Sequence, residues 1–106
     1  MHKDDEIRLR HMRDAAREAL AFSRNRSRSD LDHDRMLEHS LVRCIEIIGE
    51  AASQVTKETQ HQLPDLPWPS MVAMRNRLIH ACFDIDLDRV WDTVIEIYRP
   101  SSLLWT

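Results

Sequence analysis

The chain is organised around residues 74–86, which read Met-Arg-Asn-Arg-Leu-Ile-His-Ala-Cys-Phe-Asp-Ile-Asp. The first half of this stretch continues an apolar helical pattern, and the second half breaks into a short acidic turn. Asp86 closes the turn and is of a type that commonly caps the start of a helix. The stretch therefore predicts the end of one helix and the start of the next, with a cation, an amide and an imidazole grouped near the helix end.

Apolar residues recur every three or four positions on both sides of this stretch, a spacing typical of helices that bury one face. The pattern predicts helices over residues 4–22, 33–60 and 69–80, and a last helix that begins after Asp86 and ends before Pro100. Residues 23–30 are polar, lack this periodicity and predict a loop. Four main helices with short connections indicate an all-α fold, an antiparallel bundle of four to five helices.

Gly49 lies in the interior of the second predicted helix. Glycine costs up to about 1 kcal/mol relative to alanine at such a position. We therefore expect another backbone to approach the helix closely at Gly49. Nearby, Arg43 precedes Glu46 by three residues, a spacing that predicts an ion pair on one helix face.

Composition narrows the class of protein. With 106 residues, the chain is expected to be one domain, residues 1–106. Its formal net charge of −3 excludes a uniformly basic nucleic-acid coat but allows a local basic patch. Neither an apolar signal segment nor a run of roughly 20 apolar residues is present, so the sequence predicts a cytoplasmic protein that does not enter a membrane. Cys44 and Cys82 are expected to be free thiols.

The polar groups of residues 74–86 allow two interpretations. Asn76 and His80 are four residues apart and share a helix face, whereas Arg75 lies about 140° around from His80 and needs its long side chain, or a loosened last turn, to join them. A histidine can act as acid or base near neutral pH, and an arginine can bind a phosphate through two parallel hydrogen bonds. These groups could cleave RNA without a metal or cofactor. Alternatively, Arg75, Arg77 and His80 only balance the negative end of the helix dipole.

Two other clusters have alternative explanations. The arginines at positions 24, 26 and 28 could contact RNA phosphates or could serve a solubilising connector. The acidic run at residues 30–34 resembles the start of a calcium loop, but Arg35 and Leu41 stand where such a loop needs Gly and Glu. Helix capping explains this run better, and we predict no metal site.

The motif Arg75-Asn76-Arg77-Leu78-Ile79-His80, with the following residues 83–91, resembles the HEPN superfamily, in particular the HepT-like toxins of HepT/MntA toxin–antitoxin systems. Residues 43–52, Arg-Cys-Ile-Glu-Ile-Ile-Gly-Glu-Ala-Ala, are similar to the second-helix signature of that family. Together with the Trp68-Pro69 helix start, the resemblance covers nearly the whole chain.

This resemblance implies a homodimeric, metal-independent endoribonuclease that acts as a toxin on cellular RNA. It implies that Arg75 and His80 are the catalytic pair in a cleft shared by two protomers, and that Asn76 orients the motif or the phosphate. A dimer also suits the chemistry, because one histidine cannot act as acid and base at once. The implied partner is a small MntA-like nucleotidyltransferase antitoxin, in a dimer or a larger assembly.

The chain departs from the family pattern at Cys82, where the family has the tyrosine that the antitoxin AMPylates. The only tyrosine here is Tyr98, outside the motif. Cys82 is either an alternative acceptor or a buried thiol. Two further functions therefore stay open beside the nuclease: a degenerate HEPN protein that binds RNA or an antitoxin without cutting, and a structural subunit of a nucleotidyltransferase complex.

Overall fold

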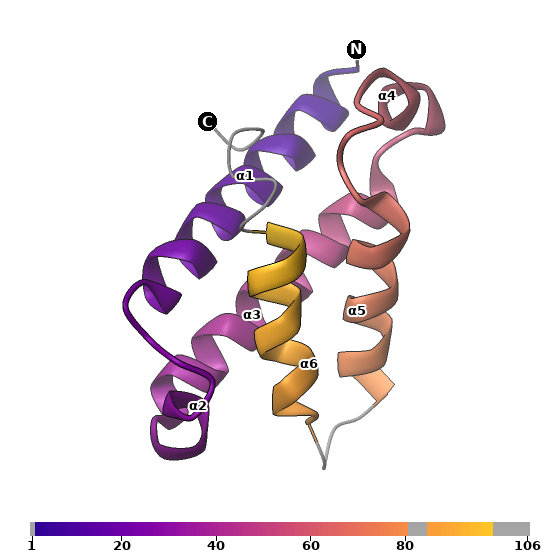
Figure 1. The fold of residues 1–106 in the computed structure, drawn as a ribbon. Helices are drawn as coiled ribbons and strands as arrows, with labels where there is room; N and C mark the ends of the chain where they lie inside the picture. The colour runs from indigo at the N-terminus through magenta and orange to yellow at the C-terminus, as the bar shows by residue number, and fades with distance from the viewer. Residues whose placement is uncertain (1, 81–84, 99–106) are drawn as a thin grey trace.

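The computed structural model describes residues 2–80 and 85–98, and the regular structure in these ranges is helical throughout (Figure 1). The all-α bundle predicted from apolar periodicity is therefore confirmed. The elements in chain order are α1 (Lys3–Ser23), α2 (Asp30–His33), α3 (Arg35–Gln54), α4 (Lys57–Gln62), α5 (Trp68–His80), α6 (Leu87–Asp92) and the π-helical segment η1 (Thr93–Tyr98).

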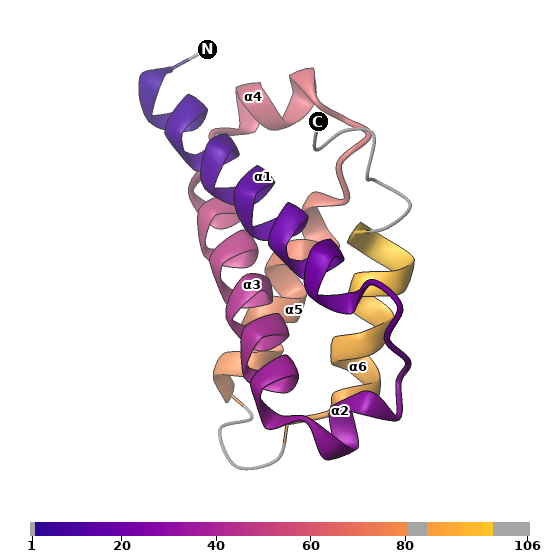
Figure 2. The same cartoon turned by 90° about the vertical axis from the view of Figure 1, so that its left-hand side faces the viewer.

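Helix α3 is the central element of the bundle. It packs along α1 on one side and along α5 on the other, and Figure 2 shows α1 and α3 running side by side. Helix α6 continues directly into η1 and closes the remaining side, while α2 and α4 sit at opposite ends (Figure 1). Among the described residues, no helix is long and apolar enough to cross a lipid bilayer.

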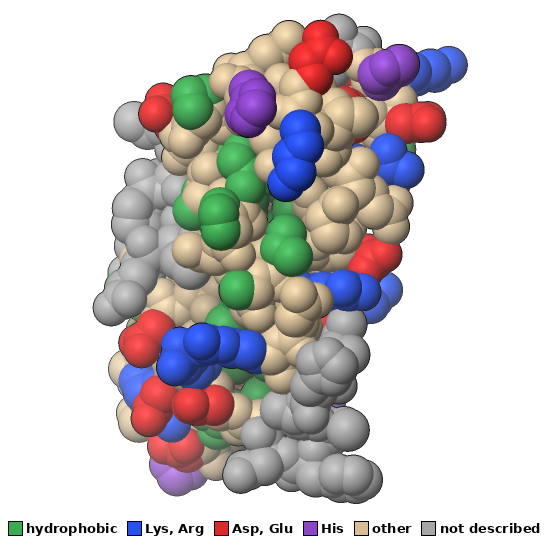
Figure 3. Space-filling view, turned by 90° about the vertical axis from the view of Figure 1, so that its right-hand side faces the viewer, with side chains coloured by type: hydrophobic (Ala, Val, Ile, Leu, Met, Phe, Trp, Pro, Cys, Tyr) green, Lys and Arg blue, Asp and Glu red, His purple; other side chains and the backbone are tan. Residues whose placement is uncertain are grey.

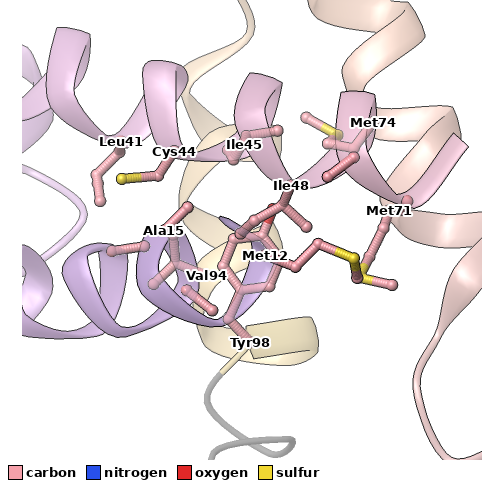
Figure 4. Close-up of a cluster of buried hydrophobic side chains, with 14 of the residues drawn as sticks. Met12, Ala15, Leu41, Cys44, Ile45, Ile48, Met71, Met74, Val94 and Tyr98 are labelled. Atoms are coloured by element: carbon pink, nitrogen blue, oxygen red, sulfur yellow. The ribbon is translucent and has the colours of Figure 1, made fainter. Parts of the chain in front are cut away.

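The core is formed where the apolar faces of these helices meet (Figure 4). Side chains from four separate segments converge there, so that no helix buries its apolar face alone. The aromatic ring of Tyr98 and the flexible side chains of several methionines fill the space between the helices. The most deeply buried apolar residues in the described part are Met12, Ala16, Ala19, Leu41, Ile45, Ile48, Ala52, Met71, Val90, Val94 and Tyr98.

The prediction of one continuous helix over residues 33–60 is wrong. The structure divides it at Asp34, which caps α3 by accepting a hydrogen bond from the Leu37 backbone N–H at 3.0 Å. It divides it again at Val55 and Thr56, whose backbones are extended. The acidic run at residues 30–34 thus includes a helix cap, as expected.

The break at Thr56 has a tertiary cause. The buried carboxylate of Asp5 on α1 accepts hydrogen bonds from the Thr56 backbone N–H at 3.2 Å and from the Thr56 and Thr59 hydroxyls at 2.6 Å each. The Thr56 hydroxyl, followed by that of Thr59, holds the pKa of Asp5 below its ordinary value. This carboxylate joins the start of α1 to the turn that begins α4.

Gly49 marks the crossing of α3 and α5, which confirms the predicted close approach of another backbone. A methyl group on Gly49 would lie 2.1 Å from Cβ of Arg75 and 2.8 Å from the backbone oxygen of Met71. Only a residue without a side chain fits between the two helices at this point. The crossing therefore fixes the part of α5 that carries Arg75.

Candidate functional site

Arg75 extends from the α3–α5 crossing toward α1. Its Nη2 lies 2.5 Å from Oε2 of Glu50 on α3, and its Nη1 donates a hydrogen bond to Oδ1 of Asn76 at 3.1 Å. The Arg75 side chain is 28% exposed, compared with 49% for Glu50. The guanidinium is therefore oriented by two neighbours and still reaches solvent.

Glu50 is the site residue that the sequence interpretation missed. The spacing of residues 43 and 46 predicts an ion pair within α3, and Arg43 does pair with Glu46 at 3.5 Å. Glu50 contacts α5 instead. A signal was present, because Glu50 directly follows the glycine that was expected to mark a close helix crossing.

The polar contacts continue from Glu50 to α1. Oε1 of Glu50 accepts a hydrogen bond from Nε2 of Gln54 at 2.7 Å, and Oε1 of Gln54 accepts one from Nε of Arg8 at 3.1 Å. Side chains of α1, α3 and α5 thus form one chain of hydrogen bonds that ends at Arg75. Such a chain limits the rotamers that each member can adopt.

A groove of about 560 Å³ lies over this chain of contacts, and Arg75 is part of its lining. Ile7, which is 42% exposed, and the half-buried Ile47 give the groove apolar wall surface. Its charged residues have both signs and include Arg8, Arg43, Glu46 and Glu50. The groove is therefore neither a basic channel nor a purely apolar cavity.

Helix α5 ends at His80, close to the predicted boundary, and stays α-helical from Arg75 to that residue. Positions 75 and 80 are therefore about 140° apart around its axis. A loosened last turn, which could have aligned the two positions, is not what the backbone shows. The His80 side chain and Cys82 lie outside the described residues.

The arginine-rich loop before α2 is engaged in ion pairs. Arg26 contacts Asp34 at 2.8 Å and Asp30 at 3.3 Å. Arg28 contacts Asp88 at 2.6 Å, which joins this loop to α6. Ion pairs within the protein thus account for two of the three arginines that were candidates for RNA contact.

Two reactive residue types are buried away from this groove. Tyr98, the only tyrosine of the chain, is fully buried, and burial raises the pKa of its phenol above the ordinary value. Its hydroxyl has no hydrogen-bond partner among the described residues. Cys44 is buried too, and its thiol pKa is raised to about 11 mainly by that burial. Neither side chain is presented to a modifying enzyme in the folded protein.

Comparisons with known proteins agree on one family. Residues 12–102 match the family described as ribonuclease HepT-like. The chain is 36% identical over 75 residues to a probable ribonuclease HepT of Thermococcus cleftensis, with 71% of this chain and 68% of that protein covered. It is 31% identical over 83 residues to a Methanocaldococcus jannaschii protein provisionally named an RNase, with 78% and 76% covered. No solved structure was found to match the chain.

Proposed function

The chain belongs to the HepT-like ribonuclease family, and from this premise we propose that it is a metal-independent endoribonuclease with Arg75 and His80 as its catalytic pair. The observation that carries the proposal is the position of Arg75. Its guanidinium is fixed by the Gly49 crossing and by Glu50, yet it remains partly exposed beside a groove. A cation held in this way can stabilise charge that develops on a phosphate.

In this mechanism Arg75 binds the scissile phosphate. The contacts to Glu50 and Asn76 use only some of the five N–H donors of the guanidinium, so other donors can reach phosphate oxygens. His80 takes the proton of the attacking 2′-hydroxyl or gives a proton to the leaving 5′-oxygen. Imidazole suits either step because it titrates near neutral pH.

We further propose that the active form is a homodimer. Two protomers would supply two histidines, one as base and one as acid, whereas one chain supplies a single His80. The separation of positions 75 and 80 around α5 supports a cleft completed by a second copy. Asn76 keeps its proposed role of orienting the motif or the phosphate, and its 3.1 Å contact with Arg75 supports the first of these.

The biological role that we propose is that of a toxin controlled by a small nucleotidyltransferase antitoxin of the MntA type. Because Cys82 replaces the family tyrosine and Tyr98 is buried, the antitoxin would act by binding, or on Cys82, rather than on a tyrosine. Co-expression with such an antitoxin should relieve growth arrest. In a Cys82→Tyr variant, modification by the antitoxin should become detectable as a mass increase.

The test of the nuclease is RNA cleavage by purified protein in EDTA. Wild type should cut RNA and arrest growth when expressed, whereas His80→Ala and Arg75→Ala should do neither while keeping helical circular dichroism and the wild-type melting temperature. Arg10→Ala serves as the charge-matched control, because Arg10 is exposed on α1 away from the groove. Normal cleavage by His80→Ala would refute the proposed catalytic pair.

A second candidate is a protein that binds RNA without cutting it. The close contact of Glu50 with Arg75 favours this alternative, because the carboxylate already occupies one of the guanidinium nitrogens that would bind a phosphate. RNA binding without product, in EDTA and equally in Mg²⁺, would support it. Cleavage in EDTA that disappears in Arg75→Ala would exclude it.

A further inference from the structure

A second groove, of about 280 Å³, lies between α5 and α6. Ser70 and Arg77 line it from α5, at a spacing of seven residues that places them on one helix face. Arg89 and Asp92 line it from α6, together with Thr93 at the start of η1. Figure 3 shows the side of the molecule on which α5 and α6 lie, where basic and acidic side chains gather toward the lower end of α6.

The two arginines of this groove differ from most of the charged groups around them. Arg77 and Arg89 are exposed, and neither forms an ion pair with another described residue. The acidic neighbours of Arg89 have other roles. Asp88 is paired with Arg28, and the carboxylate of Asp86 caps α6 through the Arg89 backbone N–H.

The groove thus combines two arginines and one carboxylate, Asp92, with the exposed residue Ser70. The Thr93 hydroxyl is not available, since it donates to the Arg89 backbone oxygen at 2.6 Å. Two guanidinium groups and a serine hydroxyl are donors that suit phosphate oxygens. One carboxylate beside them weakens an anion site without cancelling it.

The position of Arg77 connects this groove with the proposed catalytic end of α5. Arg77 precedes position 80 by three residues, which places the two positions about 60° apart and one turn along the helix. Arg75 lies farther around the helix and faces the α1–α3 side. Position 80 therefore lies, around the axis of α5, on the same side as Arg77.

We propose that the α5–α6 groove binds a backbone phosphate of the RNA strand, away from the phosphate that is cut, through Arg77 and Arg89. This inference rests on the proposed ribonuclease function and adds a subsite to it. A nucleotide strand that passes position 80 continues into this groove, where the two arginines hold one of its further phosphates. The subsite contacts only the backbone, so it contributes affinity without base specificity.

The experiment measures binding of a fluorescein-labelled single-stranded oligouridylate by anisotropy, in a His80→Ala background that leaves the RNA uncut. Arg77→Ala and Arg89→Ala should each raise Kd by about tenfold or more, as expected for loss of a hydrogen bond to a charged group. Each should also reduce the slope of log Kd against log salt concentration by about 0.7, the value for one phosphate contact in a single strand. Asp92→Asn should tighten binding.

Arg10→Ala, a control with the same loss of charge outside the groove, should leave Kd and the salt slope unchanged. The melting temperatures of all variants should match the parent, because none of these side chains is buried. If Arg77→Ala and Arg89→Ala bind like Arg10→Ala, the subsite is refuted even when wild type cuts RNA. If wild type binds RNA without cutting it and both variants weaken binding, the nuclease proposal fails, and the groove stands only as a site for a backbone phosphate of bound RNA.

Discussion

Gly49→Ala is the perturbation whose effect the structure defines most directly. The new methyl carbon would lie 2.1 Å from Cβ of Arg75, so helices α3 and α5 would have to separate by at least about 1.4 Å to restore ordinary carbon contact. The backbone oxygen of Met71 is also within 2.8 Å and cannot rotate away. The strain therefore falls on the helix crossing itself.

The expected cost follows from two opposing terms. Overpacking of a close contact costs about 1–3 kcal/mol and sometimes more. Replacing glycine by alanine inside a helix returns up to about 1 kcal/mol. Because the clash involves backbone, we expect the upper end of the first term and a net loss of about 2 kcal/mol, which lowers the melting temperature by on the order of 10 °C in a domain of this size.

Urea unfolding followed by circular dichroism measures this change, with Ser53→Ala as the control. Ser53 lies on the same helix and is exposed, so alanine there should be neutral or slightly stabilising. Gly49→Ala should also reduce RNA cleavage more than its loss of stability explains, since it displaces Arg75. A Gly49→Ala protein that is as stable as wild type, or more stable, would refute the packing argument.

Three further predictions concern the described scaffold. Asp5→Asn should lower the melting temperature at neutral pH. The stability difference between wild type and Asp5→Asn should disappear as the pH falls below 3.8, the ordinary pKa, and through the lower pKa of folded Asp5. If the melting temperature of the variant depends on acid pH as that of wild type does, this role of Asp5 is contradicted. Asp34→Ala should lower the free energy of unfolding in urea by about 1 kcal/mol because it removes the cap of α3, whereas Asp34→Asn should keep most of the capping energy. In a Cys82→Ser background, Cys44 should resist iodoacetamide in the native protein and react when the protein is unfolded; equal labelling rates in both states would show that the thiol is not protected. The free energy of unfolding should also fall as the pH rises from 9.0 toward about 11, because the unfolded thiol loses its proton first.

Local pattern was sufficient to predict much of the scaffold. The apolar periodicity of residues 4–22 and 69–80 predicted helices whose observed bounds, Lys3–Ser23 and Trp68–His80, differ by one residue at most. Asp86 was predicted to cap the last helix, and its carboxylate accepts from the Arg89 backbone N–H at 3.2 Å. These features depend on neighbours in sequence, so the sequence alone contains the information.

Long-range contacts account for what the sequence did not predict. The helix predicted over residues 33–60 breaks at Thr56 because Asp5, 51 positions earlier, binds the turn there. Glu50 reaches Arg75 because Gly49 brings α5 against α3, and a spacing rule within one helix cannot reveal a partner on another.

The sequence itself thus predicted the residue types of the proposed ribonuclease motif and the glycine that allows its helix to approach. Only the tertiary structure decided which carboxylate orients Arg75, and that Arg77 and Arg89 share a groove. The physical reason is that helical periodicity specifies which face of a helix is apolar, whereas the partners of its polar side chains depend on how separate helices pack.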